Sequence, residues 1–137
     1  MFGWLSRRRQ PETAPLTGAP PVRRQKTYSA ESGYVYQYYY LGYRVAATEG
    51  AVATEYVFNV SADRKNSFPV SVLVADEATR TWERERARDL SATERYAIAK
   101  MALFRAFDER DGPFDMHERV WVDLNSVTQT LETLGID

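Results

Sequence analysis

The residues with the clearest chemical potential lie in one acidic stretch, "FDERDGPFDMHE", which contains the only histidine of the chain. Carboxylates and an imidazole can act as general acids and bases or can bind a metal ion. The candidates are Asp108, Glu109, Asp111, Asp115, His117 and Glu118. Counted from Asp108, the third position of a calcium-binding loop would be Arg110, where an oxygen ligand is required. We therefore expect a solvated loop, and an enzyme that uses carboxylates near 108–118 is the least favoured hypothesis.

Several other chemistries find no support in the sequence. The chain has no cysteine, which excludes disulfides, thiolate metal sites and thiol nucleophiles. A Ser-His-Asp triad would need His117 as its base, and no Gly-x-Ser-x-Gly motif accompanies it. The seven glycines stand singly, so no glycine-rich phosphate loop is present. We expect no cofactor, no metal site and, on balance, no catalytic activity.

Tyrosine is concentrated in "GYVYQYYYLGYRV", residues 33–45, which holds six tyrosines in thirteen positions. Side chains alternate between the two faces of a strand. One face would then carry four phenol rings, those of Tyr34, Tyr36, Tyr38 and Tyr40. The other face is the more apolar, with Val35, Tyr39, Leu41, Tyr43 and Val45. We expect that second face to meet the helices, which leaves an exposed tyrosine ladder. A bulge at Gly42 would reverse the alternation after it.

Three interpretations of the tyrosine ladder stay open. The rings could simply be good strand formers with their hydroxyls in water. They could bind a protein, because tyrosine gives a large contact area and is enriched in interface anchors. They could also stack on single-stranded nucleic acid. We favour a small non-catalytic interaction or adaptor domain that binds a protein partner, or itself, through the ladder and Arg44.

Charge is unevenly distributed along the chain. Residues 1–32 carry six basic and two acidic side chains, a net charge of +4, whereas residues 33–137 carry twelve and seventeen, a net charge of −5. Because affinity for nucleic acid comes mainly from neutralising phosphates, the acidic body disfavours that alternative. The opening "MFGWLSRRR" predicts a docking motif or a weak peripheral membrane contact. Its residues are Phe2, Trp4, Leu5, Arg7, Arg8 and Arg9.

Hydrophobic periodicity predicts the elements. Alternating residues indicate strands over 33–45, 52–61 and 68–75, joined by short loops as an antiparallel meander. Helical spacing follows over 76–90, with Trp82 as its anchor, and over 91–110, where Ser91 and Glu94 form a capping box. In that second helix one apolar stripe comprises Tyr96, Ala99, Leu103, Ala106 and Phe107. A short strand within 118–123 and a helix from residue 124 complete the chain.

This order, βββααβα, predicts an α+β fold. We expect a three-stranded antiparallel meander plus a short fourth strand, with one face covered by three helices. The proline-rich, basic residues 1–32 are expected to be a disordered tail, and residues 33–137 a single domain. No apolar run approaches the roughly 20 residues of a membrane span, and the opening does not resemble a signal peptide. A cytoplasmic protein is the expectation.

Overall fold

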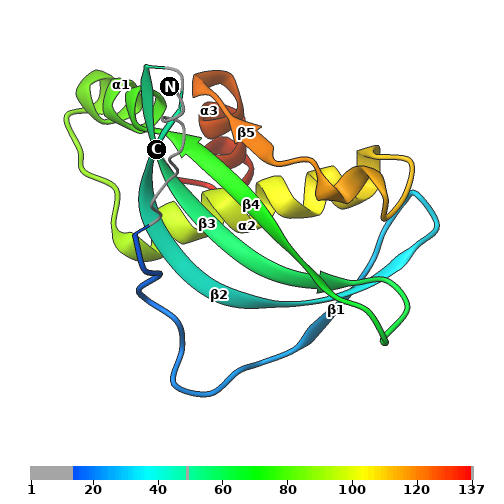
Figure 1. The fold of residues 1–137 in the computed structure, drawn as a ribbon. Helices are drawn as coiled ribbons and strands as arrows, with labels where there is room; N and C mark the ends of the chain where they lie inside the picture. The colour runs from blue at the N-terminus through cyan, green and yellow to red at the C-terminus, as the bar shows by residue number, and fades with distance from the viewer. Residues whose placement is uncertain (1–13, 49, 137) are drawn as a thin grey trace, which may run out of the picture.

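The computed structural model describes residues 14–48 and 50–136 of the chain. Five strands form one curled, mixed sheet with the spatial order β1-β2-β3-β4-β5 (Figure 1). The strands are β1 (Lys26–Ser29), β2 (Val35–Thr48), β3 (Ala51–Ser61), β4 (Phe68–Ala75) and β5 (Val120–Val122). The first four pair antiparallel with their neighbours, and β5 pairs parallel to β4.

Three helices pack on the concave side of this sheet. They are α1 (Asp76–Arg86), α2 (Ala92–Glu109) and α3 (Leu124–Thr133). The sheet curls around α2, while α1 and α3 pack together at one end (Figure 1). The predicted capping box is confirmed, because the Ser91 hydroxyl accepts from the Glu94 N–H and the Glu94 carboxylate accepts from the Ser91 N–H. A short 3₁₀ turn, η1 (Asp115–His117), precedes β5.

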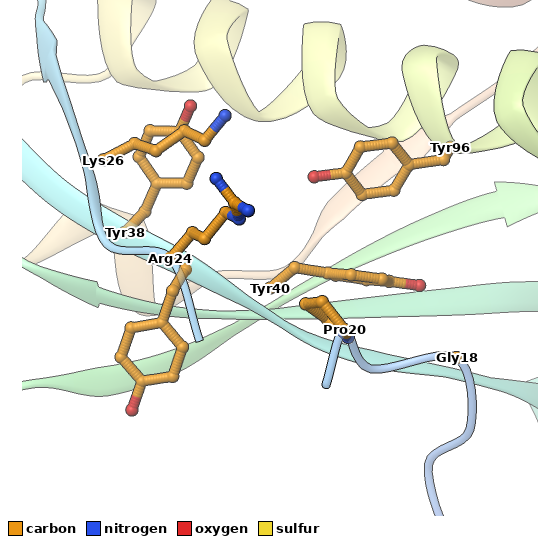
Figure 2. Close-up of a pocket in the computed structure, with 8 residues that line it drawn as sticks. Gly18, Pro20, Arg24, Lys26, Tyr38, Tyr40 and Tyr96 are labelled. Atoms are coloured by element: carbon orange, nitrogen blue, oxygen red, sulfur yellow. The ribbon is translucent and has the colours of Figure 1, made fainter. Parts of the chain in front are cut away.

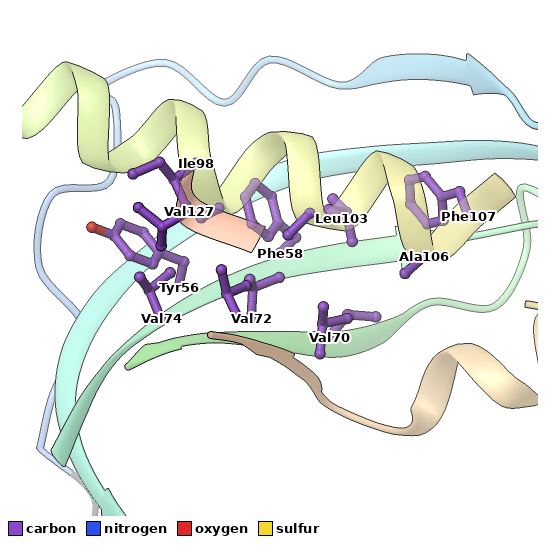
Figure 3. Close-up of a cluster of buried hydrophobic side chains, with 14 of the residues drawn as sticks. Tyr56, Phe58, Val70, Val72, Val74, Ile98, Leu103, Ala106, Phe107 and Val127 are labelled. Atoms are coloured by element: carbon purple, nitrogen blue, oxygen red, sulfur yellow. The ribbon is translucent and has the colours of Figure 1, made fainter. Parts of the chain in front are cut away.

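The hydrophobic core lies between α2 and the concave face of the sheet (Figure 3). The alternation predicted for the second and third strands is confirmed, since their even-numbered apolar residues point toward α2 and α3. The labelled core residues of these two strands are Tyr56, Phe58, Val70, Val72 and Val74. Opposite them stand Ile98, Leu103, Ala106 and Phe107 of α2, with Val127 of α3.

The predicted α+β class is confirmed, but the sheet holds one more strand than predicted. β1 lies N-terminal to Gly33, where the domain was predicted to begin, and pairs with β2. Its sequence, "KTYS", is short and mostly exposed, so it carries no apolar alternation that could reveal it. The first helix also ends earlier than predicted, at Arg86, because Ala87 adopts a positive φ of 51°.

The predicted orientation of the tyrosine ladder is wrong. Tyr36 is fully buried and Tyr38 is only 5% exposed, and both belong to the core. The pairing of β2 with β3 explains this, since Tyr38 lies opposite Val60 and Tyr40 opposite Phe58. Residues paired across strands share a face, so the core residues of β3 bring these tyrosines inward. The convex face of β2 carries the alternate residues, such as Tyr39 and Arg44.

Candidate functional site: a tyrosine-lined groove

Two adjoining cavities, of about 290 and 490 Å³, lie between the edge of β2, the N-terminal half of α2 and the segment from Gly18 to Lys26. The two cavities share Gly18, Tyr40 and Tyr96, so they form one elongated depression, which we call the tyrosine groove. Five phenol rings line its concave side: Tyr38, Tyr40, Tyr43, Tyr56 and Tyr96. Tyr39 borders it as well, from the neighbouring position in β2. In Figure 2, the Tyr96 ring lies between α2 and Tyr40.

A bulge in β2 places the Tyr43 ring on the same side of the strand as Tyr38 and Tyr40. The register with β3 shifts between Tyr40 and Gly42, as anticipated, so that Tyr43 follows Tyr40 on the concave side. Gly42 has a φ of +128°, and a Cβ there would stand 2.6 Å from the carbonyl oxygen of Thr17. Thr17 exchanges two backbone hydrogen bonds with Tyr43, of 2.9 and 2.8 Å. The bulge therefore fixes both Tyr43 and the N-terminal segment beside it.

Burial favours the neutral form of four phenol hydroxyls in the groove. Burial raises the pKa of Tyr38, Tyr40, Tyr56 and Tyr96, and for Tyr40 the neighbouring phenols raise it further. The centroids of the Tyr40 and Tyr96 rings are 4.8 Å apart. Within the described residues, the hydrogen bonds that involve tyrosine hydroxyls are those of Tyr28 and Tyr39, and the five groove hydroxyls form none. They are available to a ligand as donors and acceptors.

One end of the groove is cationic. Arg24 and Lys26 line it, and the Lys26 side chain runs toward the Tyr38 hydroxyl beneath α2 (Figure 2). Burial, followed by the charge of Lys26, lowers the pKa of Lys100 on α2, so the two ammonium groups lie close enough to repel each other. Among the ion pairs of residues 14–48 and 50–136, none involves Arg24, Lys26 or Lys100. An anionic group bound there would relieve this repulsion.

The predicted partner-binding residues do not form one surface. Tyr38 and Tyr40 line the groove, whereas Tyr36 is buried, and its ring stacks on Phe107 with a centroid distance of 4.2 Å. Tyr34 is 43% exposed and lies beside Gly112. The Arg44 side chain lies on the convex face, where its Nε donates to Glu55 at 2.8 Å.

Sequence reasoning missed half of the groove. The lining residues that it did not connect with the ladder are Tyr43, Tyr56, Tyr96, Arg24 and Lys26. Tyr96 belongs to the apolar stripe predicted for its helix, and pairing that stripe with the ladder would have identified this part of the groove. The contribution of Lys26 depends on β1, for which the sequence carries no clear signal.

Two residues of the acidic stretch, Asp108 and His117, make specific contacts with the rest of the domain. Asp108 accepts a hydrogen bond from the Tyr28 hydroxyl at 2.7 Å and another from the Glu31 N–H at 2.9 Å. The His117 ring stacks on Phe68 with a centroid distance of 3.9 Å. In the described part of the chain, no three His, Cys, Asp or Glu side chains gather closely enough to hold a metal ion.

The proposed N-terminal motif, Phe2, Trp4, Leu5 and Arg7–Arg9, lies outside the described residues. No helix within the described ranges is long and apolar enough to cross a membrane.

Comparison with known proteins gives no family for this chain: no family model, no curated protein and no solved structure matches it.

Proposed function

We propose that this chain is a small non-catalytic protein-interaction domain whose tyrosine groove binds an extended, acidic segment of a partner protein. The observation that carries the proposal is the meeting of five phenol rings with a cluster of cations that have no carboxylate partner among the described residues. This proposal keeps the predicted class of function and moves its site from an exposed ladder to the groove.

The chemistry of the groove favours a peptide. Tyrosine rings offer contact area at a low entropic cost, and their hydroxyls can bond to the peptide backbone. Arg24, Lys26 and Lys100 would attract an acidic side chain or a terminal carboxylate. At the other end, Tyr43 is 41% exposed, and Val45 and Val52 are also exposed nearby on the same face of the β2–β3 hairpin. An extended chain with acidic residues at one end and apolar residues at the other would match this order.

A second copy of the chain is the competing occupant, and the proposal does not favour it. The groove is an elongated depression bordered by Gly18, next to the residue that pairs with Tyr43, and this shape suits a single extended strand better than a folded surface. Tail docking through residues 2–9 and a cytoplasmic location both stay predictions from the sequence.

Selection from a displayed library of random linear peptides tests the proposal. We expect the full chain to enrich peptides that combine acidic and apolar residues. Lys26→Glu should abolish this enrichment, whereas Arg80→Glu, the same charge reversal on the exposed side of α1, should leave it unchanged. Tyr43→Ser should weaken binding of the enriched peptide, with Tyr34→Ser as a control of nearly equal exposure.

The folding of each variant is checked by thermal unfolding before binding is compared. Enrichment that is absent, or that survives Lys26→Glu unchanged, would refute the peptide groove. Light scattering on the same samples distinguishes the second copy, because a dimer that is lost on Tyr43→Ser would replace the peptide as the occupant.

A further inference from the structure

A third cavity, of about 300 Å³, opens on the opposite side of β2, where the segment before β1 meets the turn between β3 and β4. Three cations line it: Arg23, Arg64 and Lys65. Among the described residues, none of the three forms an ion pair or donates a side-chain hydrogen bond. We call this cavity the convex pocket. It is carried by different residues from the tyrosine groove and shares only Tyr39 with it.

The convex pocket is lined by a buried amide oxygen that has no hydrogen-bond partner among residues 14–48 and 50–136. Gln37 is only 4% exposed, yet its Oε1 accepts no hydrogen bond from any described residue. Its neighbours Tyr36 and Tyr38 face the core, so the Gln37 side chain faces the other side of the strand, where it lines the pocket. Buried polar atoms are nearly always hydrogen-bonded, so an unpaired oxygen at this position is unusual. A ligand that offers a donor beside an acceptor would satisfy it.

The cationic wall is built in advance by a tight turn. Both oxygens of Asp63 bond within that turn: Oδ1 accepts from the N–H groups of Lys65 and Asn66, each at 2.8 Å, and Oδ2 from the Asn66 amide at 3.1 Å. Arg64 takes a φ of +65°, and its N–H donates to the Ser61 hydroxyl at 3.0 Å. Asp63 is the one carboxylate of the turn, and it accepts hydrogen bonds from other groups of the turn. Arg64 and Lys65 border the cavity.

A planar surface completes the pocket. The Arg23 guanidinium lies 4.4 Å from the centroid of the Tyr39 ring, and Asn59 donates to the Tyr39 hydroxyl at 2.9 Å. The asparagine holds the ring in place, and the ring supports the guanidinium. Arginine planes and aromatic rings are the surfaces on which proteins stack unpaired nucleobases.

We propose that the convex pocket binds a nucleotide. Arg64 and Lys65 would bind its phosphate, the Arg23–Tyr39 pair would stack on its base, and the Gln37 amide would pair with a donor and an acceptor on the base edge. A carboxamide makes such a bidentate pair with adenine, which is therefore the preferred base. The cavity volume lies at the lower end of the range for small-molecule sites, which suits one nucleotide. That nucleotide can be free or part of a single strand.

Calorimetric titration of the full chain with three probes tests this proposal: adenosine monophosphate, inorganic phosphate and single-stranded oligodeoxyadenylate. We expect adenosine monophosphate to bind more tightly than phosphate. The variant Arg64→Gly/Lys65→Ala should weaken binding about tenfold or more, because it removes both charge-assisted contacts while glycine keeps the positive φ. Arg80→Ala/Arg84→Ala, which removes two cations from the surface of α1, should have no effect.

Gln37→Met separates base recognition from a general attraction for anions. It should remove the preference for adenosine monophosphate over phosphate, leave phosphate binding unchanged and leave the fold at least as stable. If the oligonucleotide binds more tightly than the mononucleotide, with a steeper salt dependence, the site is assigned to a single strand. If the two bind equally, the site is assigned to a free nucleotide. The proposal is overturned if phosphate binds as well as adenosine monophosphate, if no probe binds, or if Gln37→Met keeps the preference.

Discussion

The two faces of the sheet differ in the contacts that their side chains make. On the concave face aromatic rings stack under α2, with centroid distances of 4.2 Å between Tyr36 and Phe107 and 4.3 Å between Tyr28 and Phe104. On the convex face polar groups bond across the strands. There Glu55 accepts hydrogen bonds from Arg44, at 2.8 Å, and from Ser71, at 2.5 Å. Stacked aromatic rings thus mark one side of β2, and a hydrogen-bonded ion pair the other.

This contrast shows that the role of a tyrosine depends on the coverage of its face. Tyr36 lies under α2 and is structural, whereas Tyr40, on the same face, lies at the edge of that cover and lines the groove. Tyr39 points the other way and lines the convex pocket. The three tyrosines thus serve the core, the groove and the convex pocket, according to the face of β2 on which each ring lies and the extent to which α2 covers it.

The largest expected effect is the loss of a ring from the concave face. Phe107→Ala should destabilise the fold by about 3–5 kcal/mol, because a fully buried ring that stacks on Tyr36 leaves a cavity. Phe114→Ala removes the same side chain where it is 86% exposed and should change stability by less than about 0.5 kcal/mol. Urea unfolding measures both, and similar values for the two variants would contradict the assignment of the core.

A smaller, pH-dependent effect is expected on the convex face. Burial alone would raise the pKa of Glu55, but hydrogen bonds from Arg44 and Ser71 outweigh it and bring the pKa below its ordinary value. The carboxylate therefore stabilises the fold fully above that ordinary value, 4.5, and this contribution is lost as the pH falls through the lower, folded pKa. Glu55→Gln should cost about 2 kcal/mol at neutral pH.

Unfolding free energies at neutral and at acidic pH test this expectation. The difference between wild type and Glu55→Gln should shrink under acid, while Glu85→Gln, at an exposed ion pair, should show little difference at either pH. A loss for Glu55→Gln that is the same at both pH values would mean that the ion pair does not stabilise the convex face.

Local patterns sufficed to predict most elements from the sequence. The alternation of β3 and β4 and the Ser91–Glu94 capping box depend on residues close together in the chain, and these predictions are confirmed. The orientation of β2 could not be predicted from that strand alone, because both of its alternating sets contain large apolar residues. Its pairing with Phe58 and Val60 decides the question, and that is a contact between strands.

Only the part of the groove that comes from one continuous segment of the chain was predictable. Tyr38 and Tyr40 were singled out because they stand in one tyrosine-rich segment. Tyr96 joins them only when α2 crosses the sheet, and Lys26 only because β1 adds to the edge of β2. A strand of four mostly exposed residues owes its place to pairing rather than to an apolar pattern, so its sequence gives little warning of it.

The smallest expected effect is the removal of a single hydroxyl from the concave face. The Tyr36 hydroxyl is buried and has no hydrogen-bond partner among the described residues, so Tyr36→Phe should leave stability unchanged or raise it slightly. Tyr28→Phe is the matched control, because its hydroxyl donates to Asp108 at 2.7 Å, and its loss should cost about 1 kcal/mol. If thermal unfolding shows equal losses for the two variants, the Tyr36 hydroxyl has a partner, and the concave face is not held by apolar stacking alone.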